Sequence, residues 1–269
     1  MIMGPTASGK SELAMRVAEI LGGEIITADS MQVYRGLDIG TAKPSDAERG
    51  RVPHHLVDVL DISEPLDVYT YTTMAWEKIR EVLGRGRLPI VAGGSGLYIR
   101  ALVYGLDPLP GAAALRARLE EEYSGEEGFA RLKALMSERD PEDFGRWHSH
   151  QRKLIRALEV FELTGSSITA LQKTWPGGPA TPLSGAWRLE WDREELKARI
   201  RRRTAEMLRS GWVEEAEAMI GRGLLSSPTA RQAIGYATIG EFLEGKISFA
   251  EMEERITVAT RQYARRQIT

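Results

Sequence analysis

The sequence contains no cysteine in 269 residues and only 4 histidines. The missing cysteine excludes disulfide bonds, thiolate metal sites and a cysteine nucleophile, and it fits a reducing compartment. The histidines occur as His54-His55 and as His148-x-His150, and neither spacing is that of a metal site. We therefore expect both pairs to be structural.

Long hydrophobic runs are also missing. No stretch reaches the roughly 20 apolar residues that a membrane-spanning helix needs, and the first residues lack the basic start and apolar core of a signal peptide. We expect a cytoplasmic protein. The formal net charge is only -2, so overall charge gives no sign of a nucleic-acid partner. With 42% hydrophobic and 28% charged residues, the chain can form one α/β domain plus a smaller insert.

A glycine-rich phosphate loop stands at the start of the chain. The run GPTASGKS, Gly4 to Ser11, satisfies the pattern GxxxxGK[ST] in full. In such a loop the backbone N–H groups face the phosphates, Lys10 reaches the terminal phosphate and Ser11 binds Mg²⁺. Only three residues precede the loop, where a strand of about five is usual, and the chain stops within a helical pattern. We expect residues to be missing at both ends.

Hydrophobic periodicity predicts an α/β fold with a parallel sheet covered on both faces. The expected elements before the middle of the chain are a helix at 11–21, strands at 24–30, 55–62 and 88–92, and a helix near 70–83. From residue 112 to about 174 every run has a helical period, and Pro/Gly clusters flank this stretch at 108–110 and 175–179. A strand at 186–191 returns to the sheet, and helices are expected to start near Arg193, Gly211, Ala230 and Phe249.

These patterns predict two domains. Residues 1–108 and 183–269 form a P-loop NTPase-like core with C-terminal helices, and residues 109–182 form a helical insertion domain.

The phosphate loop has no obvious magnesium aspartate beside it. Nucleotide hydrolases pair such a loop with an apolar strand that ends in aspartate, whereas strand 88–92 ends in Gly93-Gly94-Ser95. Asp58 and Asp61 lie in alternating runs that are typical of a solvated face. Asp29 follows the strand after the loop's helix, where open α/β sheets bind ligands. From the residues alone, a structural or metal-binding role and a general-base role for Asp29 both stay open.

Basic residues gather in stripes although the chain is slightly acidic. Arginines one helical turn apart occur as Arg152/Arg156, Arg199/Arg203 and Arg261/Arg265. A single stripe is usually a solvated face, but three of them indicate contacts with anions, which arginine forks bind bidentately. For most of the tryptophans we favour core packing over base stacking; the set is Trp147, Trp175, Trp187, Trp191 and Trp212.

Taken together, the motifs resemble those of the tRNA isopentenyl transferase (tRNA dimethylallyltransferase) family over almost the whole chain. The matching runs are GPTASGKSELA, ADSMQVYRGLDIGTAKP, GGSGLYIRAL, KLIRALEVFELTG, ARQAIGYATIGEFLEG and TRQYARRQIT. The run from Asp29 to Pro44 is the most specific, because the phosphate loop alone occurs in many kinases.

The resemblance implies a reaction and a set of catalytic residues. Such enzymes transfer a dimethylallyl group from dimethylallyl diphosphate to the exocyclic amine of adenosine at tRNA position 37, forming isopentenyladenosine and releasing diphosphate. Asp29 would be the general base, while Lys10, Mg²⁺ on Ser11 and the channel arginine Arg203 would stabilise the leaving group. The diphosphate would lie on Gly4, Pro5, Thr6, Ala7, Ser8, Gly9, Lys10 and Ser11.

The resemblance also implies tRNA contacts, made by the insert and by the walls of a channel that receives the flipped base. Ser95 stands where threonine is usual, and the run HSHQRK departs from the family pattern just before Arg152. The implied tRNA-binding residues are Asp29, Ser30, Met31, Gln32, Ser95, Arg116, Arg152, Lys153, Leu154, Ile155, Arg156, Arg231, Gln232, Ala233, Ile234, Gly235, Tyr236, Arg265 and Arg266. We expect a monomer that binds the anticodon stem-loop of tRNA.

Two alternative classes of function stay open. The first is an ATP-using P-loop kinase of a small molecule, or a prenyltransferase that acts on free adenylate. The second is a non-catalytic RNA-binding or nucleotide-switch protein, which would tolerate the loss of Asp29.

Overall fold

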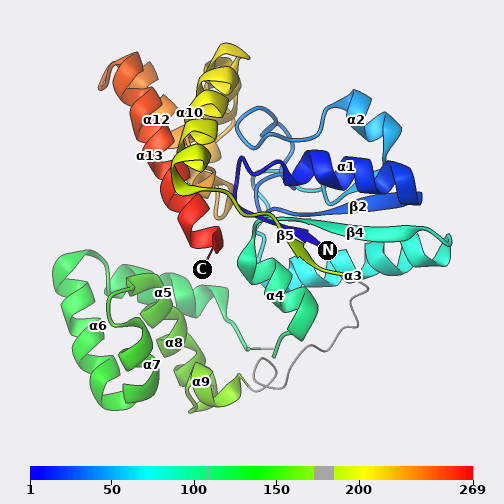
Figure 1. Ribbon diagram of the computed structural model, residues 1–269. Helices are drawn as coiled ribbons and strands as arrows, with labels where there is room; N and C mark the ends of the chain where they lie inside the picture. The colour runs from blue at the N-terminus through cyan, green and yellow to red at the C-terminus, as the bar shows by residue number, and fades with distance from the viewer. Residues whose placement is uncertain (108, 173–184, 269) are drawn as a thin grey trace. The chain divides into compact units, whose positions relative to one another are not determined.

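The computed structural model describes residues 1–107, 109–172 and 185–268 (Figure 1). It separates into two compact units, one of residues Met1–Val103 with Pro182–Thr269 and the other of residues Tyr104–Thr181. The Pro/Gly cluster expected at 175–179 lies outside the described residues, as does Trp175.

The first unit is built on a five-stranded sheet in the order β3-β2-β4-β1-β5, with every pair parallel. The strands are β1 (Ile2–Met3), β2 (Gly23–Ala28), β3 (His54–His55), β4 (Leu88–Gly93) and β5 (Trp187–Arg188). All six residues of β2 are buried, as expected for an inner strand of a sheet with helices on both faces. The predicted α/β class is confirmed.

The helices of this unit follow the sheet strands and then form the C-terminal part of the chain. Figure 1 shows α1 and α3 on opposite faces of the sheet. The helices are α1 (Lys10–Leu21), α2 (Asp46–Arg51), α3 (Val68–Gly84), α4 (Gly96–Tyr104), α10 (Arg193–Arg209), α11 (Trp212–Gly221), α12 (Tyr236–Leu243) and α13 (Phe249–Ile268), with 3-10 turns η2 (Leu224–Ser226) and η3 (Ala230–Gln232).

The side chains of the strands alternate between two hydrophobic cores. Ile25 and Ile90 pack with Ala14 of α1 on one face of the sheet. Ile26 and Val91 belong to the larger core on the other face, together with residues of α3, α11 and α12. Because successive strand residues point to opposite faces, these runs must be apolar almost throughout.

Three of the predicted elements are wrong in extent, and one of them, the strand expected at 186–191, is only β5, Trp187–Arg188. The strand expected at 55–62 is reduced to β3, because Leu56 and Asp58 adopt left-handed backbone conformations with φ of 62° and 56°. The Asp58 carboxylate is bound by Lys43 and Arg49 at 2.5 and 2.7 Å, which holds the chain out of the sheet. The helix expected near Ala230 is the short 3-10 turn η3, and α12 starts only at Tyr236.

The second unit consists of helices in the part of it that the structure describes, in agreement with the helical period. They are α5 (Ala113–Glu122), α6 (Gly125–Arg139), α7 (Pro141–Trp147), α8 (Gln151–Thr164) and α9 (Ile168–Leu171). Leu154 and Leu158 of α8 are fully buried in the core of this unit. Within the described ranges of both units, no helix has the length and apolar character that crossing a membrane requires.

Candidate functional site

The phosphate loop joins β1 to α1 and is held from outside by two side chains. The Trp191 indole donates to the Ser8 carbonyl at 2.8 Å, and the Arg199 Nε donates to the Ala7 carbonyl at 2.8 Å. The Arg199 guanidinium also lies 4.1 Å from the Trp191 ring, a favourable cation–π arrangement. Arg199 therefore supports the backbone of the loop.

The charged side chains of Lys10 and Arg203 are both largely buried at the phosphate loop. Burial lowers the pKa of Lys10 to about 8; Asp29 acts in the opposite direction and Arg203 adds to the lowering. Arg203 Nη1 donates to Thr6 Oγ1 at 3.3 Å, and burial lowers the pKa of Arg203 as well. Cations taken out of water are stabilised by a counter-charge, so this arrangement favours the binding of an anion.

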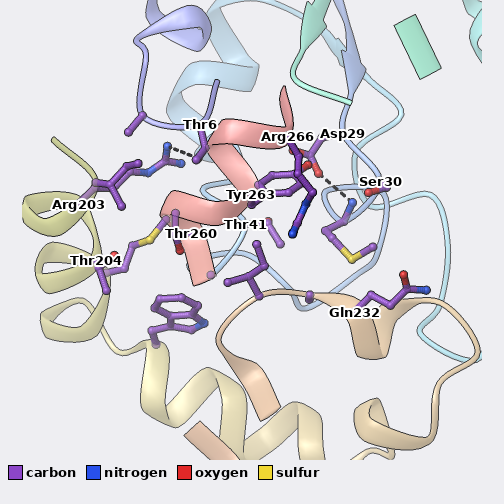
Figure 2. Close-up of a pocket in the computed structure, with 18 residues that line it drawn as sticks. Thr6, Asp29, Ser30, Thr41, Arg203, Thr204, Gln232, Thr260, Tyr263 and Arg266 are labelled. Atoms are coloured by element: carbon purple, nitrogen blue, oxygen red, sulfur yellow. Dashed lines mark hydrogen bonds between the residues drawn. The ribbon is translucent and has the colours of Figure 1, made fainter. Parts of the chain in front are cut away.

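Asp29 is the first residue beyond the carboxyl end of β2. Its Oδ1 accepts the Met31 N–H at 2.9 Å, which fixes the turn that follows the strand. Figure 2 shows Asp29 facing the same cavity as Thr6, Arg203 and Tyr263. This cavity, the larger of the two that Asp29 lines, has a volume of about 270 Å³ and is lined by the phosphate loop, residues 29–31 and 40–41, α10, η3 and α13.

A smaller cavity of about 120 Å³ lies on the other side of these residues. Both cavities are lined by Thr6, Asp29, Arg203 and Tyr263. Lys10 and Ser11 line only the smaller cavity of the two. The Asp29 carboxylate therefore stands between a cavity at the phosphate loop and a second cavity that can receive another reactant.

Several expected residues of the first unit line the larger cavity. They are Thr6, Ala7, Asp29, Ser30, Met31, Arg203, Gln232, Ala233, Ile234 and Arg266. The side chain of Gln32 instead donates to the carbonyls of Thr41 and Ala42, at 2.9 and 3.2 Å, and lines the smaller cavity.

Other expected residues do not line the larger cavity. Arg231 and Arg265 are exposed, whereas Gly235 and Tyr236 are buried beside it. Ser95 is half-buried at the start of α4, where its N–H donates to the Ala28 carbonyl.

In the second unit, the expected basic residues fall into two groups. Arg116 and Arg156 both bind the buried carboxylate of Glu159, at 2.7 and 2.8 Å, and so stabilise this unit. Arg152 and Lys153 are exposed on α8. Leu154 and Ile155 are buried in the helical core and do not present their side chains to a ligand.

Several residues at the cavity had no signal of their own in the sequence. Tyr263 and Gln267 lie in the run TRQYARRQIT, and Gln267 Oε1 accepts the Thr6 N–H at 2.7 Å. The other unexpected lining residues are Gly40, Thr41, Ile200, Thr204, Met207, Trp212 and Thr260. Core packing is the sequence-based expectation for Trp212; its side chain is buried, and it also lines the larger cavity.

The packing at the end of β4 explains why this strand does not end in the aspartate that nucleotide hydrolases have. A Cβ on Gly93 would lie 2.1 Å from the Ala28 carbonyl oxygen, so no side chain fits between β2 and β4 at this point. In the ranges that the structure describes, no group of three or more His, Asp or Glu side chains is arranged to hold a metal ion.

Comparison with known proteins assigns the family. The model for IPP transferase matches residues 32–269, and the model for isopentenyl transferase matches residues 1–58. The chain belongs to the IPP transferase family. A family relative named tRNA dimethylallyltransferase from Halorhodospira halophila is 46% identical, over 100% of this chain and 87% of its own length. The tRNA dimethylallyltransferase of Geobacter sulfurreducens is 43% identical, with the same two coverages.

Solved structures of IPP transferases agree with this assignment. The full-length tRNA isopentenylpyrophosphate transferase from Bacillus halodurans is 35% identical with a TM-score of 0.69, over 99% of this chain and 84% of that one. A eukaryotic dimethylallyltransferase described as acting on tRNA has a TM-score of 0.80 at 26% identity, over 99% of this chain and 68% of its own.

Proposed function

We propose that this protein transfers a dimethylallyl group from dimethylallyl diphosphate to the exocyclic amine of adenosine 37 in tRNA. The observation that carries the proposal is that Asp29 lines both cavities, of which the smaller one is also lined by Lys10 and Ser11 of the phosphate loop. The diphosphate occupies the smaller cavity and the adenine enters the larger one. The names of the relatives support tRNA as the acceptor.

The reaction forms one bond and breaks one. The lone pair of the adenine amine attacks C1 of the dimethylallyl group, the C1–O bond breaks, and its electron pair leaves with the diphosphate. Asp29 accepts the proton that the amine loses. Lys10 and Arg203 stabilise the negative charge that grows on the departing diphosphate, which is the charge that changes most during the step.

A magnesium ion fits beside the loop. The Ser11 hydroxyl is exposed at the start of α1 and lines the smaller cavity with Asp29, and hydroxyl and phosphate oxygens are ligands that Mg²⁺ prefers. When bound, the ion supplies charge neutralisation to the diphosphate.

The helical unit binds the anticodon stem-loop in this proposal, with Arg152 and Lys153 among the contacts to phosphate. A monomer in the cytoplasm, where tRNA is modified, is sufficient for the reaction because all proposed catalytic residues come from one chain.

The proposal is tested by transfer of label from dimethylallyl diphosphate to a short anticodon stem-loop RNA in the presence of magnesium. Free AMP and a stem-loop with the target adenosine replaced are the controls. We expect label in the intact RNA only. Label in AMP would indicate an adenylate prenyltransferase, and ATP turnover without RNA would indicate a kinase; either result contradicts the proposal.

Binding of dimethylallyl diphosphate without RNA is expected to weaken above pH 8. In the empty site Lys10 has a pKa of about 8, so it is charged below this pH and becomes neutral above it. The bound anion favours the charged form and raises the pKa, so binding takes up a proton and affinity falls by up to about 10-fold per pH unit in the window above 8. The phosphate itself titrates lower, near pH 6.

Calorimetry at pH 7, 8 and 9, in two buffers of different ionisation enthalpy, measures both the affinity and the proton uptake. In the Lys10→Gln variant the pH dependence should disappear. Proton uptake that persists in this variant would assign the effect to another group.

Binding of RNA is expected to depend less on salt when Arg152 and Lys153 are both changed to glutamine. Each lost phosphate contact reduces the slope of log K against log salt by about 0.7 to 0.9. The matched control is Arg139→Gln, another exposed basic side chain of the helical unit. An unchanged slope in the double variant would show that these side chains form a solvated face.

A further inference from the structure

A single carboxylate collects four hydrogen bonds behind the larger cavity. Glu215 Oε2 on α11 accepts the backbone N–H groups of Asp38 and Ile39 at 2.9 and 2.7 Å. Its Oε1 accepts the Gly40 N–H at 3.1 Å and the Tyr236 hydroxyl at 2.6 Å. Three consecutive backbone amides and one phenol therefore share one side chain, which joins residues 38–40 to α11 and α12.

These contacts lie where the segment and the helices approach most closely. A Cβ on Gly40 would be 2.2 Å from Trp212 Nε1 and 2.6 Å from the Tyr236 hydroxyl. The rings of Trp212 and Tyr236 meet edge to face, with centroids 6.0 Å apart. Because Gly40 and Trp212 both line the larger cavity, the contact that Glu215 maintains between them forms part of the cavity wall.

The segment held by Glu215 is the one that begins with Asp29. Asp29 and Met31 lie at its start and Thr41 near its end, and all three line the larger cavity. The Gln32 amide donates to the Thr41 carbonyl at 2.9 Å and so ties the two ends together. A shift of residues 38–40 is therefore passed to the turn that holds the Asp29 carboxylate.

The chemistry of this contact requires a carboxylate. Each oxygen of the Glu215 side chain accepts two hydrogen bonds. Both oxygens of a carboxylate are acceptors, so all four donors are satisfied. A carboxamide has an NH₂ group in place of one oxygen, and this group would face two of the donors. Burial raises the pKa of Tyr236, and the Glu215 carboxylate raises it further, so the hydroxyl keeps its proton and remains a donor.

We propose that Glu215 is a positioning residue for the acceptor substrate, which holds residues 38–40 against α11 and α12 and so places the acceptor wall of the larger cavity relative to Asp29. Among the residues that the structure describes, Glu215 makes no hydrogen bond to the phosphate loop, and residues 38–40 do not line the smaller cavity, so the larger effect is expected on the acceptor side. This inference rests on the proposed function, since the acceptor is taken to be adenosine in RNA.

The test compares Glu215→Gln with Glu217→Gln, an exposed glutamate of the same helix. We expect Glu215→Gln to lower kcat/KM for the stem-loop RNA by about 10- to 100-fold, because a displacement of about 1 Å has effects of this order. The Kd of dimethylallyl diphosphate should stay within 2-fold of that of the unchanged protein. Hydrogen exchange should become faster at the amides of residues 38–40 and remain unchanged in α1.

Two results would overturn the inference about Glu215. A kcat/KM within 2-fold of the control overturns the inference, and so does an equal loss of affinity for both substrates, which would show a general loss of structure. If Glu215→Gln does not fold, Tyr236→Phe removes one of the four donors and keeps the ring, and the same split between the two substrates is expected with a smaller effect. If the unchanged protein does not prenylate RNA, the proposed function fails rather than the role of Glu215.

Discussion

Turnover of the Asp29→Asn variant is expected to be at least about 100-fold lower than that of the unchanged protein, the usual effect of losing a general base. The carboxamide has the shape of the carboxylate, and its oxygen can still accept the Met31 N–H that the Asp29 Oδ1 accepts at 2.9 Å. The turn after β2 should therefore survive, and the affinity for RNA should change little. What is lost is the ability to take the proton from the adenine amine.

Single-turnover rates and RNA affinity, measured on the same preparations, check this expectation. Asp46→Asn, at an exposed position in α2, is a matched control that should be without effect. If affinity for RNA fell as much as the rate, Asp29 would be a binding residue and the base would have to be found elsewhere.

The Arg203→Gln variant is expected to lose about 100- to 1,000-fold in kcat, the range found when one donor to a developing negative charge is removed. Arg203 lines both cavities and donates to Thr6 of the phosphate loop at 3.3 Å. In the proposed reaction it therefore lies where the C1–O bond of the prenyl diphosphate breaks. Binding of the intact diphosphate should weaken less than the rate, because the charge on the leaving oxygen grows during the reaction.

Arg201 of the same helix provides the control. Its side chain is 68% exposed and lines none of the cavities that the described residues form at the phosphate loop, so Arg201→Gln removes the same charge from the same helix at a surface position. The two variants should be compared by presteady-state rates and by the Kd of dimethylallyl diphosphate. Equal losses in rate and in ground-state affinity for Arg203→Gln would show a role in binding alone.

The sheet and the phosphate loop could be predicted because they depend on local patterns. Apolar runs such as 23–28 and 88–93 are buried on both sides, and the loop has a fixed spacing between its glycines and Lys10. The extent of β3 could not be predicted in this way. The alternation over 55–62 is overridden by tertiary ion pairs, since Asp58 is captured by Lys43 and Arg49.

In the site, too, some residues could be predicted from local sequence patterns, and others depend on contacts between distant parts of the chain. Asp29 could be singled out because it follows a strand at the carboxyl edge of the sheet, where ligands bind. Arg203 lies almost two hundred positions after the loop that it contacts; the spacing of Arg199 and Arg203 indicated an anion contact, but only the family resemblance placed Arg203 beside the phosphate loop. Glu215 had no signal, because it stands among Glu214 and Glu217 on an amphipathic helix and only the fold shows which of these acids turns inward.

The close approach of β2 and β4 at Gly93 limits what this scaffold can become during evolution. A hydrolase of the same architecture needs an aspartate at the end of a neighbouring strand, but any side chain at position 93 would collide with the main chain at Ala28. A single codon change therefore cannot give this protein that carboxylate, because two strands would have to separate first. The backbone itself therefore keeps the magnesium-binding carboxylate of such hydrolases out of position 93.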